Sequence, residues 1–72
     1  MVAGTGHLVS QKAQTLLRSS EQYALRQLEV EMTPQGLVIS GQVESFYLKQ
    51  QAQETIRAVV RDVPLINQID VV

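Results

Sequence analysis

Two stretches of alternating apolar and polar residues, joined by a short turn sequence, constrain the fold more than any other feature of the chain. In each stretch the apolar residues take every second position, which is the spacing of a β-strand with one buried and one solvated face. The inward positions are Leu28, Val30 and Met32 in the first stretch and Leu37, Ile39, Gly41 and Val43 in the second. Residues 33–36, Thr-Pro-Gln-Gly, predict a hairpin turn in which Gly36 is free to adopt positive φ. Gly41 has no side chain to bury, so we expect it to mark either the close approach of a packed helix or a bulge.

The second strand leads into an amphipathic helix. Ser45 is a suitable N-cap residue, so we expect the helix to begin at Phe46. Apolar positions then recur at steps of three and four residues, and the pattern ends before Pro64 because proline cannot continue a helix comfortably. The residues expected on the buried helix face are Leu48, Ala52, Thr55, Ile56, Val59 and Val63.

The two ends of the chain supply the remaining elements. Apolar or small residues recur at helical spacing from Leu8 to about Ser19, which predicts a first helix, and residues 21–26 are expected to connect it to the first strand. Residues 1–7 contain two glycines and no periodicity, so we expect a flexible lead-in before a single domain of residues 8–72. Residues 65–72 alternate again and predict a last strand, whose facing the alternation leaves open.

This order of elements predicts an α+β fold. Two helices can cover only one face of a small sheet, and the outward positions of the first two strands are polar. Because a helix connects the second strand to the third, these two strands should be parallel, whereas the hairpin strands are antiparallel. We therefore expect a two-layer αββαβ sandwich with two helices on one face of a small three-stranded mixed sheet.

Composition argues against catalytic and cofactor chemistry. The chain has 72 residues, no cysteine and one histidine, His7, which falls in the expected lead-in without preorganised neighbours. We therefore expect no catalytic residue, no metal site and no cofactor. A formal net charge of -1 and an outward strand face without aromatic side chains argue against a nucleic-acid partner. Neither a signal peptide nor a membrane-spanning stretch is recognisable, so the chain as written is expected to be soluble and untargeted.

One ordered set of residues runs through the hairpin, the following helix and the last strand. It comprises Leu37, Ile39 and Gly41 in a hydrophobic-x-hydrophobic-x-Gly run, then Val43, Ser45, Lys49, Ala52, Ala58, Ile66, Asn67, Ile69 and Val71. With this spacing, residues 28–72 resemble the BON domain (bacterial OsmY and nodulation), a small αββαβ module. The chain departs from that family at residues 61–64, Arg-Asp-Val-Pro, where the helix usually ends in Gly-Val. The resemblance implies a binding role at a periplasmic or envelope surface, phospholipid included, and no catalytic residues.

Basic and aromatic residues meet on the second helix. Basic residues belong mostly to the predicted helices and acidic residues to the strands, so the domain should have a basic side and an acidic side. Four-residue spacing aligns a stripe from Lys49 to Arg61, and two aromatic residues precede it where a helix start often leaves rings exposed. Exposed rings beside cations suit an anionic lipid headgroup region, an envelope component or another anionic partner surface. The expected binding residues are Phe46, Tyr47, Lys49, Arg57 and Arg61, and structural roles are expected for Gly36, Gly41, Ser45 and Asn67.

Two other interpretations stay open from the sequence. A solvated helix face is commonly charged, Glu54 can neutralise Arg57 three residues away, and rings at a helix start can cap the core. The second functional hypothesis is a protein-interaction or self-assembly module that binds a protein partner or another copy through a sheet edge or the open sheet face. Its expected contacts are Val38, Ser40, Gln42 and Val72.

Overall fold

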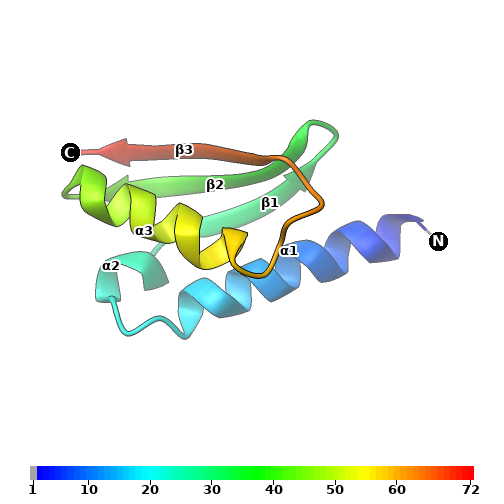
Figure 1. The fold of residues 1–72 in the computed structure, drawn as a ribbon, viewed down its shortest axis with the longest axis horizontal. Helices are drawn as coiled ribbons and strands as arrows, with labels where there is room; N and C mark the ends of the chain where they lie inside the picture. The colour runs from blue at the N-terminus through cyan, green and yellow to red at the C-terminus, as the bar shows by residue number, and fades with distance from the viewer. Residues whose placement is uncertain (1) are drawn as a thin grey trace.

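A computed structural model describes residues 2–72, with side chains from residue 7 onward. The elements, in order, are α1 (Val2–Arg18), α2 (Tyr23–Arg26), β1 (Glu29–Thr33), β2 (Gly36–Val43), α3 (Phe46–Arg57) and β3 (Leu65–Val71). β2 lies at the centre of the sheet, antiparallel to β1 and parallel to β3. α1 packs on β1 and α3 packs on β3 and β2, so the helices gather on one side of the sheet (Figure 1). The predicted α+β sandwich with a mixed sheet is confirmed.

The core lies between the helices and the inward face of the sheet. Its buried side chains are all aliphatic and include the inward positions expected for β2. The parallel register sets Leu65, Asn67, Ile69 and Val71 beside the inward residues of β2, which resolves the facing of β3. The buried residues are Ala13, Leu17, Leu25, Leu28, Leu37, Ile39, Val43, Ala52, Ile56, Val60 and Ile69.

The hairpin between β1 and β2 closes as predicted. Thr33 pairs with Gly36, which leaves a two-residue loop of Pro34 and Gln35. The Thr33 hydroxyl donates to the Gly36 carbonyl at 2.9 Å and accepts from the Gln35 N–H at 3.2 Å. Gly36 adopts a φ of +145°, and a Cβ there would lie 2.5 Å from the Pro64 carbonyl oxygen. Glycine is therefore required both by the backbone conformation and by the close approach of Pro64.

Gly41 also adopts positive φ, at +132°. A Cβ at this position would lie 2.7 Å from Cδ2 of Leu28, whose side chain is fully buried. The sequence predicted that this glycine would mark the close approach of a packed helix or a bulge, and the structure contains neither feature here, because the registers of β2 continue without a bulge. The crowding residue instead belongs to the segment between α2 and β1, which passes directly over the inward side of β2.

The first helix is longer at its N-terminal end than the sequence predicts. It begins at Val2, so residues 2–7 are helical and the expectation of no regular structure there is wrong, while Met1 lies outside the described residues. Gly4 and Gly6 each disfavour a helix by about 1 kcal/mol relative to alanine. Extending a helix that is already formed needs no new nucleus, however, and each added residue gains one hydrogen bond.

The predicted connection at residues 21–26 contains the short helix α2. Leu25 in this helix is buried, and its N–H donates to the Gln22 carbonyl at 3.1 Å. The side chain of Arg26 fastens the turn, because its Nε donates to the Ser20 carbonyl at 3.0 Å. Sequence periodicity misses α2 because a single turn is too short to repeat a pattern.

The third helix ends at Arg57, well before the expected end near Pro64. Val59 was expected in the core but is 41% exposed, and Val60 is buried in its place. The Val59 N–H donates to the Ile56 carbonyl, so the last turn tightens and shifts the following residues around the axis. Two consecutive β-branched residues at 59–60, close ahead of Pro64, favour an extended backbone over a helix.

Candidate functional site

The first turn of α3 begins where the sequence predicts. Ser45 has an extended backbone, with φ of -149°, and its hydroxyl accepts a hydrogen bond from the Leu48 N–H at 3.2 Å. This cap satisfies one of the free donors at the helix start. Because the buried positions of α3 are Ala52 and Ile56, the helix turns its first two residues away from the core. Phe46 and Tyr47 are 75% and 63% exposed, which confirms that the helix start presents aromatic side chains.

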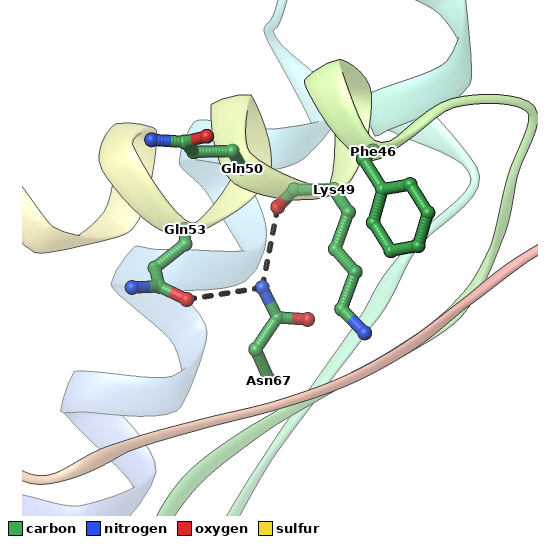
Figure 2. A pocket seen from close by; sticks show the side chains of 5 residues that line it. All are labelled: Phe46, Lys49, Gln50, Gln53 and Asn67. Carbon is green, nitrogen blue, oxygen red and sulfur yellow. Dashed lines mark hydrogen bonds between the residues drawn. The ribbon is translucent and has the colours of Figure 1, made fainter.

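Phe46 and Lys49 lie together in a shallow pocket of about 300 Å³ between α3 and β3. The other lining residues are Gln50, Gln53 and Asn67. Figure 2 shows the Lys49 side chain beside the Phe46 ring, both on the side of α3 that faces β3, with Gln50 directed away. The pocket therefore joins an apolar surface to a cation.

Asn67 connects the floor of this pocket to both elements. Its Nδ2 donates to the Lys49 carbonyl at 3.2 Å and to Oε1 of Gln53 at 3.1 Å, and its Oδ1 accepts from the Ile69 N–H at 3.1 Å. With both ends of the amide engaged, Asn67 has a structural role here, and the groups left to meet a ligand are the Phe46 ring, the Lys49 ammonium and the amide nitrogen of Gln53.

Tyr47 lies on the neighbouring row of α3, outside the pocket of Phe46 and Lys49. Its hydroxyl accepts from Nε2 of Gln51 at 2.9 Å. Tyr47, Gln50, Gln51 and Glu54 line a separate hollow of about 210 Å³. Gln50 borders both hollows, so the two rings flank one continuous strip of helix surface.

Arg57 and Arg61 lie at the opposite end of α3. Arg57 is the last helical residue and Arg61 follows the helix, so the predicted stripe does not continue as a helical row. The two arginines nevertheless line one open hollow of about 450 Å³ with Glu54 and Ala58. Lys49 and Arg57 are separated by about 12 Å along the helix axis, at about 1.5 Å per residue. The structure thus divides the five predicted binding residues into two groups.

The basic side is narrower than the sequence suggests, because Arg18 bonds the chain's own backbone and Glu29. Arg18 forms an ion pair with Glu29 at 3.0 Å, the one ion pair among the described residues, and also donates to the Leu28 and Arg26 carbonyls. Glu54 therefore does not neutralise Arg57 by direct contact. Arg26 donates to the Ser20 carbonyl and stacks over the Tyr23 ring, with its guanidinium carbon 5.8 Å from the ring centre.

Side-chain amides occupy both edges of the sheet. Gln14 of α1 donates from Nε2 to the Leu28 carbonyl and accepts at Oε1 from the Val30 N–H, both at 2.9 Å. Its amide thus bonds the β1 edge as a residue of a neighbouring strand would. On β3, Oδ1 of Asn67 accepts a hydrogen bond from the Ile69 N–H. Sequence patterning could not reveal Gln14, since a polar residue on an amphipathic helix normally reads as solvated.

The open face of the sheet carries the residues of the second functional hypothesis. Val38 and Ser40 are half-buried and Gln42 is exposed. Val38 lies beside Ile66 in the parallel register, which makes a small apolar pair on this face. Val72 is exposed at the end of β3, where its N–H donates to the Val43 carbonyl at 2.9 Å.

The described residues form neither a metal-binding cluster nor a membrane-spanning helix. Within the described part of the chain, no group of three or more histidine and acidic side chains could hold a metal ion. His7 lies exposed on α1. None of the described helices combines the length and the apolar composition needed to cross a bilayer. No family model, curated protein or solved structure matches the chain.

Proposed function

We propose that this protein is a non-enzymatic binding module of the BON type, which contacts an anionic phospholipid surface or an envelope-associated partner through the start of α3. One observation carries the proposal: Phe46 is 75% exposed beside the ammonium group of Lys49, in a shallow pocket open to a partner. An exposed ring keeps apolar surface in contact with water. Covering that surface with a partner lowers the free energy, so binding is favoured.

Phospholipid suits this pair of groups. A ring can enter the boundary between headgroups and acyl chains while a neighbouring cation stays at the level of the phosphates. Each lysine or arginine near an anionic leaflet contributes about 1 kcal/mol, so one lysine gives weak attraction. Tyr47, whose hydroxyl stays bonded to Gln51, supplies a second amphipathic ring. Arg57 and Arg61 add positive potential farther along the helix.

The BON assignment is supported by the order of strands and helices and by the use of its matching residues. Ser45 caps α3, Gly41 admits Leu28, and Asn67 joins β3 to α3. The additional helix α2 and the early end of α3 are features of this chain beyond the αββαβ plan.

A titration of the ¹⁵N-labelled domain with anionic vesicles or short-chain micelles tests the proposal. We expect shifts or broadening at the start of α3, weaker at moderate salt than at low salt. Phe46→Ala should reduce binding, with Leu8→Ala as the control because Leu8 is also exposed but lies on α1. Lys49→Gln should also reduce binding, with Lys12→Gln on α1 as its control. Equal losses from the controls, or no response to any vesicle, would refute the proposal.

Self-association through the open sheet face is a second candidate, favoured by the Val38 and Ile66 pair on that face. The sheet edges suit this role less well, because Gln14 and Asn67 already bond edge groups. Sedimentation of the wild type and of Val38→Lys decides the matter. If the apparent mass of the wild type rises with concentration and that of Val38→Lys does not, self-association through this face is favoured. A wild type that stays monomeric at all concentrations excludes it.

A further inference from the structure

All three aromatic side chains of the chain are exposed at one end of the molecule. The sequence contains one phenylalanine and two tyrosines, and the buried core contains aliphatic side chains alone. Tyr23 in α2 is 69% exposed, close to the values for Phe46 and Tyr47. α2 packs against α3, and Figure 1 shows it at the same end of the long axis as the start of α3. The chain thus keeps its aromatic residues for one exposed tip.

The area of this tip is large for so small a domain. A phenylalanine or tyrosine side chain buries roughly 150–250 Å² when fully covered. At the observed exposures, the three rings leave on the order of 300–500 Å² in contact with water. The largest apolar patch on a typical monomer is roughly 300–600 Å² and is often functional. Together the three aromatic residues therefore expose an area of the same order as such a patch.

Each of two rings at the tip has a cation beside it. Arg26 stacks over Tyr23 and is held in place by the Ser20 carbonyl, while Lys49 lies beside Phe46. The two pairs come from different helices, so the arrangement occurs twice independently. Glu21 and Glu44 are also exposed near these helix starts, and their two negative charges offset the two positive ones. Attraction to an anion therefore depends on close contact with each cation and not on a net positive charge.

We propose that the domain meets a phospholipid surface end-on, with Tyr23 and Arg26 of α2 as a second anchor beside Phe46 and Lys49. This inference rests on the proposed function and specifies the orientation of the bound domain. The rings enter the headgroup boundary, the two cations meet lipid phosphates, and the 38 Å long axis points away from the bilayer.

The end-on orientation removes Arg57 and Arg61 from the contact. Arg57 lies about 17 Å along α3 from Phe46, at about 1.5 Å per residue. The Debye length at physiological ionic strength is about 8 Å, so charges this far from the surface are largely screened. A domain lying flat along α3 would instead need both arginines at the membrane.

Vesicles of phosphatidylglycerol and phosphatidylcholine at about 0.15 M salt separate the two orientations. We expect Tyr23→Ala and Phe46→Ala each to lower the partition coefficient about fivefold to tenfold, and Arg57→Gln/Arg61→Gln to change it less than about twofold. Spin-labelled lipid should broaden amide signals in residues 21–28 and 44–50 and spare residues 57–63. Circular dichroism confirms that each variant stays folded.

Three results would overturn the end-on orientation. In the first, wild-type partition persists in Tyr23→Ala. In the second, the double arginine variant loses binding and broadening extends along all of α3. The proposed function would then hold, but the contact surface would be the whole length of α3 and not the tip. In the third, the wild type binds no vesicle, so the proposed function fails together with this inference.

Discussion

The side-chain amide of Asn67 in β3 donates to the backbone carbonyl of Lys49 in α3 at 3.2 Å. The strand and the residue that carries the cation of the candidate site are therefore joined directly. A second bond to Oε1 of Gln53 and a third from the Ile69 N–H complete the use of the amide. The position of Lys49 thus depends on β3 as well as on its own helix.

Replacing Asn67 should weaken the fold and loosen the site. Asn67→Ala removes three hydrogen bonds and should lower the free energy of unfolding by about 1–3 kcal/mol. Asn67→Asp should also destabilise, because a carboxylate has no donor for the two oxygens that face it. Urea denaturation measures both, with Gln68→Ala as the control on the exposed face of the same strand. If Asn67→Ala and the control have the same free energy of unfolding, these hydrogen bonds make no net contribution to stability.

Gln14 should stabilise the contact between α1 and β1. Gln14→Ala leaves the Val30 N–H and the Leu28 carbonyl without their partner, and should cost about 1–2 kcal/mol in unfolding free energy. Gln11 is exposed on the same helix, so Gln11→Ala should change stability by less than about 0.5 kcal/mol. Hydrogen exchange at Val30 should accelerate in Gln14→Ala alone. Unchanged exchange there would contradict the role assigned to this amide.

Gly41 should tolerate no side chain. In Gly41→Ala the added Cβ would lie 2.7 Å from Cδ2 of Leu28, so this buried side chain must shift within the core, and the positive φ disfavours any L-residue. We expect a loss of about 2–4 kcal/mol from these two effects. Ser40→Ala, one position away on the open face, is the control. Thermal unfolding that shows similar midpoints for both variants would mean that β2 can shift at this point without penalty.

The cap at Ser45 should support the aromatic turn. Ser45→Ala removes the acceptor for the Leu48 N–H and should reduce stability by about 1 kcal/mol, whereas Ser45→Asp should preserve it because aspartate caps equally well. If the cap also orients the rings, Ser45→Ala should weaken vesicle binding and Ser45→Asp should restore it in part. Equal stability of the two variants in urea would be inconsistent with capping by this hydroxyl.

Sequence patterning predicts this fold well where residues repeat and poorly where a single contact decides. Strand alternation identified the inward residues of β2, and turn chemistry placed Gly36 correctly. Sequence patterning did not predict the early end of α3, because helix periodicity alone does not distinguish Val59 from Val60 as the buried residue. The exposed rings of Phe46 and Tyr47 were predicted from their place at a helix start.

The same limits apply to the candidate site. Tyr23 was missed because no periodic segment surrounds it, and its proximity to α3 is a tertiary fact. Arg18 lies in the first predicted helix and was therefore counted with the basic side, although it bonds Glu29 and two carbonyls of the chain's own backbone. Charge counts in a sequence cannot distinguish an arginine that holds a loop from one that awaits a partner. The separation of Lys49 from Arg57 and Arg61 likewise depends on where α3 stops.

The contact between Gln14 and β1 also bears on how this protein would begin to aggregate. The amide that bonds the Leu28 carbonyl and the Val30 N–H is carried by α1, which also supplies Ala13 and Leu17 to the core, so this part of the β1 edge stays shielded while the helix is packed. Detachment of α1 would also uncover Ala13 and Leu17, so it is a larger opening than the fraying of a loop. Association through β1 should therefore follow the population of chains in which α1 is detached and stay rare in the native ensemble.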